Sequence, residues 1–155
     1  MNYLRRQSAA MLFLLLPAFA WAQTASELDV LLETRQVSAE AAARFTLGAA
    51  GMLPPELGGA EAREAAYRMA RDRGWIKAEA GEAIKLRDAA FLAMGAFDLP
   101  GGLLYALFPG PRYAYREAVH MRIIQGRADP AMAVSGPRLL QIIGRASAHA
   151  EGGGL

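Results

Sequence analysis

Three short segments of this 155-residue chain align without gaps, and this repetition constrains the fold more than any other feature. They read VSAEAAA at 37–43, IKLRDAA at 84–90 and VSGPRLL at 134–140. Each opens with a β-branched residue, and the openings at 37, 84 and 134 lie 47 and 50 residues apart. An Ala-rich helical chain also gives weak self-matches, but this match includes the junction between loop and helix. The spacing therefore predicts three helix–loop–helix repeats, which would share one core because a single repeat cannot bury its apolar face.

The periodicity of the apolar residues predicts an all-α fold. Apolar side chains recur every three to four residues, and the period-two alternation of strands is absent. Ser38 and Ser135 stand at N-cap positions, and Gly51, Gly74 and Gly126 stand where helices should end. We expect helices over residues 25–32, 38–50, 60–73, 85–97, 112–124 and 136–148, and a short helical turn between prolines at 103–108.

The first 22 residues have the features of a signal peptide. Arg5 and Arg6 precede an apolar run at 9–19, and Ala20-Trp21-Ala22 has the small-x-small pattern of a cleavage site. A membrane anchor is the alternative, but the apolar run is shorter than the ~20 residues that a spanning helix needs. Removing 22 of the 155 residues leaves 133, which is enough for one domain with a modest core.

The expected domain organisation follows from the signal peptide and the repeats. We expect a signal peptide at 1–22, a helical repeat domain at 23–148 with repeats at about 26–51, 60–98 and 111–148, and a disordered tail at 149–155. Cleavage would leave an exported protein with no membrane-spanning segment.

Charge and composition argue against several functional classes. The chain has 17 basic and 15 acidic residues, and losing Arg5 and Arg6 leaves 15 of each, so it lacks the basic face that nucleic-acid binding needs. Cysteine is absent, which excludes disulfides and thiolate metal sites. The two histidines, His120 and His149, have no paired spacing, so we expect no zinc site and no cofactor.

The second and third repeats carry motifs that resemble the S-layer homology domain. In the third, IIQG at 123–126 is followed by Pro130 and then Val134-Ser135; in the second, Gly74-Trp75-Ile76 precedes Ile84-Lys85. The resemblance implies a module of three helical repeats that attaches to a cell-wall polymer without catalysis. It spans about residues 26–148.

The chain departs from this family at the junction that helps to form the polymer pocket. The family's arginine is replaced by Ala39, Leu86 and Gly136 in the three repeats. Its glutamate is replaced by Ala41, Asp88 and Arg138, so only Asp88 retains an acid. Polymer binding would therefore depend on other residues.

A cluster of arginines and tyrosines is the strongest candidate binding surface. Arg112 and Arg116 are four residues apart, so both lie on one helix face, and guanidinium groups bind carboxylates and phosphates. A solvated helix face with tyrosines at the core edge would produce the same pattern. The candidate ligand- or partner-binding residues are Trp75, Asp88, Arg112, Tyr113, Tyr115, Arg116 and Arg127. The apolar segment 103–108 is expected to be buried; exposure would indicate a partner protein or a membrane surface.

Two functions remain open for an exported domain of this kind. The first is a binding or scaffold module of the cell envelope, with cell-wall polymer or peptidoglycan as its partner. The alternative is a periplasmic adaptor that uses the same fold to bind an envelope protein. A cell-wall enzyme ranks third, because the sequence contains no nucleophile elbow, P-loop or dinucleotide-binding motif.

Overall fold

The computed structural model describes the backbone of residues 16–126 and 129–152, with side chains from residue 25 onward. These residues form α1 (Leu16–Glu33), α2 (Ala39–Ala49), α3 (Gly59–Asp72), α4 (Leu86–Ala96), α5 (Leu103–Leu107), α6 (Pro111–His120) and α7 (Gly136–Ala150). No strand occurs within these ranges; the extended contacts there are two isolated bridges, Ser38 with Ala83 and Lys85 with Ala133. The all-α prediction is confirmed.

Three of the predicted helices agree with the structure to within one residue, and one of them has a side-chain cap. Helices α2, α3 and α4 begin and end within one residue of the predicted bounds, and the Ser38 hydroxyl accepts a hydrogen bond from the Ala41 amide at 3.3 Å. Gly51 and Gly74 follow α2 and α3 with φ of 67° and 70°, as C-terminal glycines do. The predicted end of α6 at residue 124 is wrong, because α6 stops at His120.

Both ends of the described chain are more helical than the sequence predicts. Helix α1 starts nine residues before the predicted start at 25, so it includes residues 16–22 of the predicted signal peptide. Residues 1–15 of the predicted signal peptide lie outside the described residues, and cleavage after Ala22 stays a prediction. Helix α7 runs through Ala150, so residues 149 and 150 of the predicted tail are helical. Over residues 16–126 and 129–152, we find no helix with both the length and the apolar character needed to cross a bilayer.

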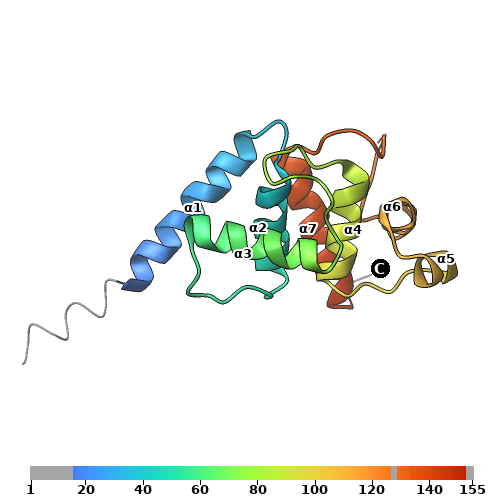
Figure 1. The fold of residues 1–155 in the computed structure, drawn as a ribbon, viewed down its shortest axis with the longest axis horizontal. Helices are drawn as coiled ribbons and strands as arrows, with labels where there is room; N and C mark the ends of the chain where they lie inside the picture. The colour runs from blue at the N-terminus through green and yellow to red at the C-terminus, as the bar shows by residue number, and fades with distance from the viewer. Residues whose placement is uncertain (1–15, 127–128, 153–155) are drawn as a thin grey trace, which may run out of the picture.

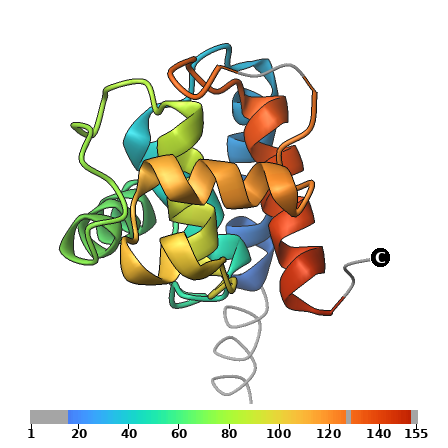
Figure 2. The same cartoon turned by 90° about the vertical axis from the view of Figure 1, so that its right-hand side faces the viewer.

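Helices α2, α4 and α7 form the centre of the molecule, and three other helices pack around them. Each central helix contacts the other two (Figure 1). Helix α3 packs on α2, α6 crosses α4, and α1 packs on α7, as the two views in Figures 1 and 2 show. Each outer helix therefore packs on a central helix from a different predicted repeat.

The three aligned segments meet in a closed cycle of backbone hydrogen bonds. The Val37 amide donates to the Val134 carbonyl at 2.8 Å, Val134 donates to Ile84 at 3.1 Å, and Ile84 donates to Val37 at 2.9 Å. All three side chains are fully buried. The cycle satisfies backbone groups that burial would otherwise leave without partners.

A second set of hydrogen bonds surrounds this cycle, two residues further along each segment. The Ala39 amide donates to the Glu82 carbonyl at 2.8 Å, and the Leu86 amide donates to the Met132 carbonyl at 2.9 Å. The third bond runs from the Gly136 amide to the Thr34 carbonyl at 2.9 Å. Each central helix therefore begins in contact with the loop that precedes another segment.

Small residues allow the central helices to approach closely. Alanines at matching positions of α2 and α4 are almost completely buried, and larger aliphatic side chains fill the space between helices. The largest such side chains are Leu47, Ile76, Ile84, Leu86, Leu92, Met94, Leu139 and Ile142.

The predicted burial of segment 103–108 is wrong. Leu103, Leu107 and Phe108 have exposed fractions of 75%, 61% and 62%. In this segment Tyr105 makes the inward contact, as it lies half-buried against Phe91 of α4. Helix α5 has only five residues, and with Tyr105 directed inward its leucines face outward.

Candidate functional site

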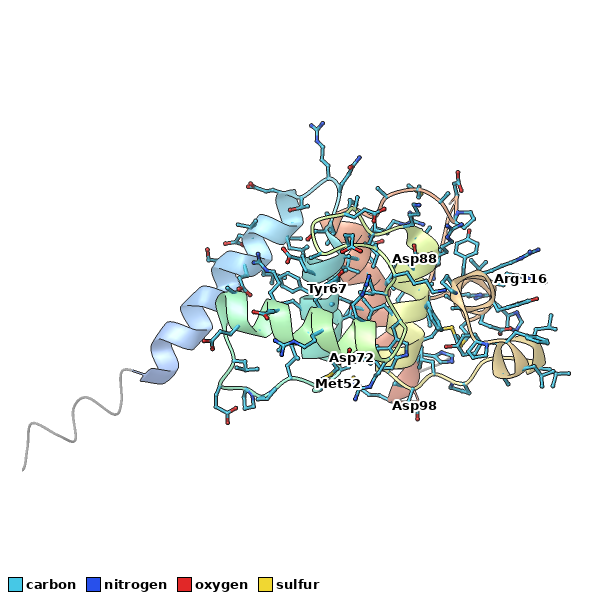
Figure 3. The ribbon with its side chains drawn as sticks, in the orientation of Figure 1. Met52, Tyr67, Asp72, Asp88, Asp98 and Arg116 are labelled. Atoms are coloured by element: carbon cyan, nitrogen blue, oxygen red, sulfur yellow. The ribbon has the colours of Figure 1, made fainter. Side chains whose placement is uncertain are left out.

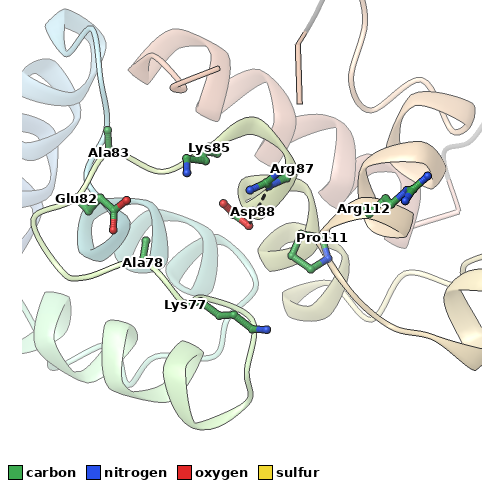
Figure 4. Close-up of a pocket in the computed structure, with 9 residues that line it drawn as sticks. All are labelled: Lys77, Ala78, Glu82, Ala83, Lys85, Arg87, Asp88, Pro111 and Arg112. Carbon is green, nitrogen blue, oxygen red and sulfur yellow. Dashed lines mark ion pairs between the residues drawn. The ribbon is translucent and has the colours of Figure 1, made fainter. Parts of the chain in front are cut away.

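A pocket of about 480 Å³ opens where α4 and α6 begin. The loop from Lys77 to Ala83 forms one wall, the first turn of α4 forms the floor, and Pro111 with Arg112 forms the opposite edge (Figure 4). Its lining residues are Lys77, Ala78, Glu82, Ala83, Lys85, Arg87, Asp88, Pro111 and Arg112. We call this the α4 pocket.

The lining of the α4 pocket carries more positive than negative charge. Four of the nine lining residues are basic and two are acidic, which gives a net charge of +2 for the charged forms. Figure 4 shows the Asp88 carboxylate between the lysine and arginine side chains of the first turn of α4, while Arg112 points outward from α6. An excess of cations around a hollow favours an anionic ligand.

Asp88 is the most buried carboxylate of this pocket, and its surroundings disfavour its charge. Its side chain is 21% exposed, and its Oδ1 lies 4.0 Å from Nε of Arg87. Burial raises the pKa of Asp88, and the attraction of Arg87 and Lys85 lowers it by less. The carboxylate therefore takes up a proton more readily than an aspartate in water.

Contacts from α3 hold the loop wall of the pocket in place. The Tyr67 hydroxyl donates to the Ala78 carbonyl at 2.8 Å, and Nη1 of Arg71 donates to the Lys77 carbonyl at 2.7 Å. On the other side, the Arg87 amide donates to the Pro130 carbonyl at 3.0 Å. The pocket is thus formed by segments from several parts of the chain, which side-chain and backbone hydrogen bonds join.

The three positions that replace the family's glutamate line three different pockets. Asp88 lines the α4 pocket, whereas Ala41 lines a pocket of about 300 Å³ between α1, α2 and α3. Arg138 lines a third pocket of only about 10 Å³, where its guanidinium donates to the Gln125 carbonyl at 3.1 Å. Of the three positions, only that of Asp88 combines an acid with several basic neighbours in an open hollow.

The three positions that replace the family's arginine are closed by the core. Ala39 and Leu86 are completely buried. At Gly136 even a Cβ atom would overlap the carbonyl oxygen of Leu31. None of these three positions lines the α4 pocket, whose cations are Lys77, Lys85, Arg87 and Arg112.

The structure brings together some of the predicted site residues and separates others. Asp88 and Arg112 line the same pocket, whereas Trp75 lies over Gly95 with Arg73 above its ring at 5.3 Å. Arg116 is exposed on α6. Tyr113 and Tyr115 are half-buried on the same helix. Arg127 lies outside the described residues.

Lys77, Lys85 and Arg87 are pocket residues that the sequence reasoning missed. A signal was available, because Lys77 and Lys85 are the only lysines in the chain and both line this pocket. They were missed because Lys77 lies in a loop and Lys85 at a helix start, so no helical periodicity relates them to Arg112.

The chemistry of the α4 pocket suits the binding of an anion. Its four cations and two carboxylates can form ion pairs and charge-assisted hydrogen bonds with a ligand. Within the described ranges, no three His, Cys, Asp or Glu side chains converge as metal ligands would. No family model matches the chain, and no curated protein or solved structure matches it either.

Proposed function

We propose that this protein is an exported, non-catalytic module of the cell envelope that binds an anionic cell-wall polymer in the α4 pocket. The observation that carries the proposal is the placement of Lys77, Lys85 and Arg87 around the half-buried Asp88, with Arg112 at the edge of the pocket. The expected signal peptide would deliver the protein to the compartment in which such a polymer is found.

The proposal includes a scaffold of three repeats around one shared core. The closed cycle of hydrogen bonds through Val37, Ile84 and Val134 supports it, because each aligned segment makes the same contact with the next. The packing of α1 on α7 supports it as well, since it joins the first repeat to the last. The S-layer homology domain, which the sequence motifs resemble, has this organisation.

The chemistry of the pocket suggests what part of a polymer would be bound. Lysine ammonium groups and the Arg87 guanidinium would pair with carboxylate or phosphate groups of the polymer. When ionised, Asp88 would accept a hydrogen bond from a sugar hydroxyl. Such a set of contacts recognises charge and hydroxyl groups together, as a polysaccharide or polyol phosphate presents them.

Co-sedimentation with purified peptidoglycan sacculi, with and without their attached polymers, tests the proposal. We expect the exported protein to pellet only with polymer-bearing sacculi. The Lys77→Ala/Lys85→Ala protein should bind at least about tenfold more weakly, because each contact with a charged group contributes about 1.5–3 kcal/mol. The matched control is Arg35→Ala/Arg68→Ala, which removes two exposed cations and leaves the pocket intact.

The same experiment separates this function from that of a protein adaptor. An adaptor with no glycan recognition would not pellet with either kind of sacculus. Equal pelleting of the two double variants would remove the α4 pocket from consideration even if the wild-type protein bound.

A further inference from the structure

The pocket of about 300 Å³ between α1, α2 and α3 is a second possible binding site, which we call the α1 pocket. None of its eleven lining residues lines the α4 pocket. Figure 3 shows Asp88 of the α4 pocket at the start of α4, with α2 between that helix and α1 in this view. The volume of the α1 pocket is at the lower end of the range for small-molecule sites, so it suits a small ligand.

The floor of the α1 pocket is apolar. Leu31 and Val37 are almost completely buried, whereas Val30 at the edge is 65% exposed. Ala41 occupies the position that Asp88 occupies in the second aligned segment, so the corresponding carboxylate is missing here. An apolar group of a ligand would leave water by lying on this floor. The apolar lining residues are Val30, Leu31, Val37, Ala41 and Phe45.

One carboxylate and one guanidinium group line the α1 pocket, from Glu27 of α1 and Arg63 of α3. Oε2 of Glu27 lies 3.7 Å from Nη2 of Arg44, and Nη1 of Arg63 lies 3.9 Å from Oε1 of Glu40. Both ion pairs are longer than a hydrogen bond. Within the part of the chain that the structure describes, Oε2 of Glu27 and Nε of Arg63 are buried without a hydrogen-bond partner. Both groups therefore keep unused hydrogen-bonding capacity beside the hollow.

The polar groups of the α1 pocket favour a zwitterion over a polyanion or a sugar. One acid and one base leave its lining without net charge, so it does not attract an anionic polymer as the α4 pocket does. Two of its four hydroxyl and amide side chains already bond to the backbone. The Thr34 hydroxyl donates to the Val30 carbonyl at 2.7 Å, and the Ser38 hydroxyl accepts from the Ala41 amide at 3.3 Å. A sugar, which presents several hydroxyl groups, would find few free partners.

We propose that the α1 pocket binds a short free peptide with an apolar side chain. The ammonium group of the peptide pairs with Glu27, its carboxylate pairs with Arg63, and its side chain lies on the floor beside Leu31. This site is separate from the α4 pocket, so the protein would hold a peptide and a polymer at the same time.

Titration with the dipeptide alanyl-leucine, followed through the amide chemical shifts of the purified protein by NMR, tests the proposal. We expect saturable shifts at residues of the α1 pocket, among them Leu31 and Ala41. N-acetylated alanyl-leucine lacks the ammonium group, and alanyl-leucinamide lacks the carboxylate. Each should bind at least about tenfold more weakly, because each loses one contact with a charged group.

The Glu27→Gln variant tests the ammonium contact. It should bind alanyl-leucine about tenfold more weakly and the N-acetylated dipeptide as the wild type does, because only the first has an ammonium group. The matched control is Glu33→Gln, which neutralises an exposed carboxylate of α1 that does not line the pocket. Glu27 also pairs with Arg44, so circular dichroism should verify that the variant is folded.

The Val30→Ser variant tests the apolar contact while all charges remain. Val30 is exposed, so this change leaves the core intact. It should weaken the binding of alanyl-leucine and of its N-acetylated form alike, by about fourfold, because each buried CH₂ group contributes about 0.8 kcal/mol.

Three outcomes would overturn the proposal. They are the absence of shifts at the α1 pocket with alanyl-leucine, equal binding of the N-acetylated dipeptide by the wild-type protein, and tighter binding of N-acetylglucosamine than of alanyl-leucine at this pocket. The result is independent of polymer binding, because Glu27→Gln leaves the α4 pocket unchanged and should pellet with polymer-bearing sacculi as the wild type does.

Discussion

Gly136 shows how one backbone contact can decide which residue a position accepts. Its amide donates to the Thr34 carbonyl, and its Cα lies against the end of α1, where a Cβ atom would overlap the Leu31 carbonyl oxygen. The matching positions in the other segments, Ala39 and Leu86, place their side chains in the core. The third segment differs because α1 packs on α7 at this point.

Replacing Gly136 with alanine should therefore be far more costly than the same change elsewhere in α7. We expect Gly136→Ala to lower the free energy of unfolding by about 3 kcal/mol, because backbone must move to remove the overlap. Gly144→Ala is the control: nothing lies within 4 Å of a Cβ there, and alanine should raise stability by up to about 1 kcal/mol. Urea unfolding measures both values, and equal stability of the two variants would contradict the α1–α7 contact.

Residues with a strong local preference could be predicted from the sequence, and others could not. The Ser38 cap and the glycines at 51 and 74 were identified correctly, because a hydroxyl cap and a positive φ each select few residue types. Helix α6 instead stops at His120, and Arg122, two residues later, has a φ of 58°. Burial of Ile123 and Ile124 requires the turn there, and no local signal in the sequence marks it.

At the scale of elements, the α4 pocket depends on helix starts that lie far apart in the sequence. Asp88 could be singled out because it occupies a junction position in the aligned segments, and Arg112 because it belongs to an arginine cluster. Both residues line one pocket because α6 crosses α4, and the spacing of residues in the sequence does not predict that crossing. The exposure of α5 was not predicted for a similar reason: Phe91 of α4 contacts Tyr105, and this contact decides which residue of α5 faces inward.

The raised pKa of Asp88 predicts that anion binding in the α4 pocket strengthens as the pH falls. Lowering the pH through this raised pKa removes the carboxylate charge, so the net positive charge of the pocket increases. We expect Asp88→Asn to bind a sulfated oligosaccharide about fivefold more tightly at neutral pH, because two unit charges 4 Å apart interact by about 1 kcal/mol in water. Calorimetric titration over a pH series measures the effect.

A sulfated probe keeps its own charge over this range, so the pH dependence belongs to the protein. The Asp88→Asn protein should lose most of this dependence. Glu82→Gln serves as the control, because it removes the other carboxylate of the pocket and leaves Asp88 in place. A pH dependence that survives in Asp88→Asn but disappears in Glu82→Gln would contradict the prediction, because Glu82 would then be the responsible carboxylate.

At the scale of the whole molecule, the aligned segments predicted which parts of the chain are alike but not how they pack. The helix expected at 25–32 belongs to α1, which packs on α7, while α3 packs on α2 and α6 on α4. These contacts join residues that are distant in the sequence, and their geometry depends on all three segments at once. The cycle through Val37, Ile84 and Val134 makes this dependence explicit, because removing any segment breaks two of its three hydrogen bonds.

The cycle predicts that the three amides exchange hydrogen with solvent only when the whole domain unfolds. In an open array of repeats the terminal units fray first, so the Val37 and Val134 amides would exchange faster than that of Ile84. In the closed cycle we expect all three to show the same free energy of opening, equal to that of global unfolding. Native-state hydrogen exchange at increasing denaturant measures these values, with the Phe108 amide of α5 as an internal reference for local opening. Markedly faster exchange at Val37 would show that α1 and α2 open separately, and that the three segments do not form one cooperative core.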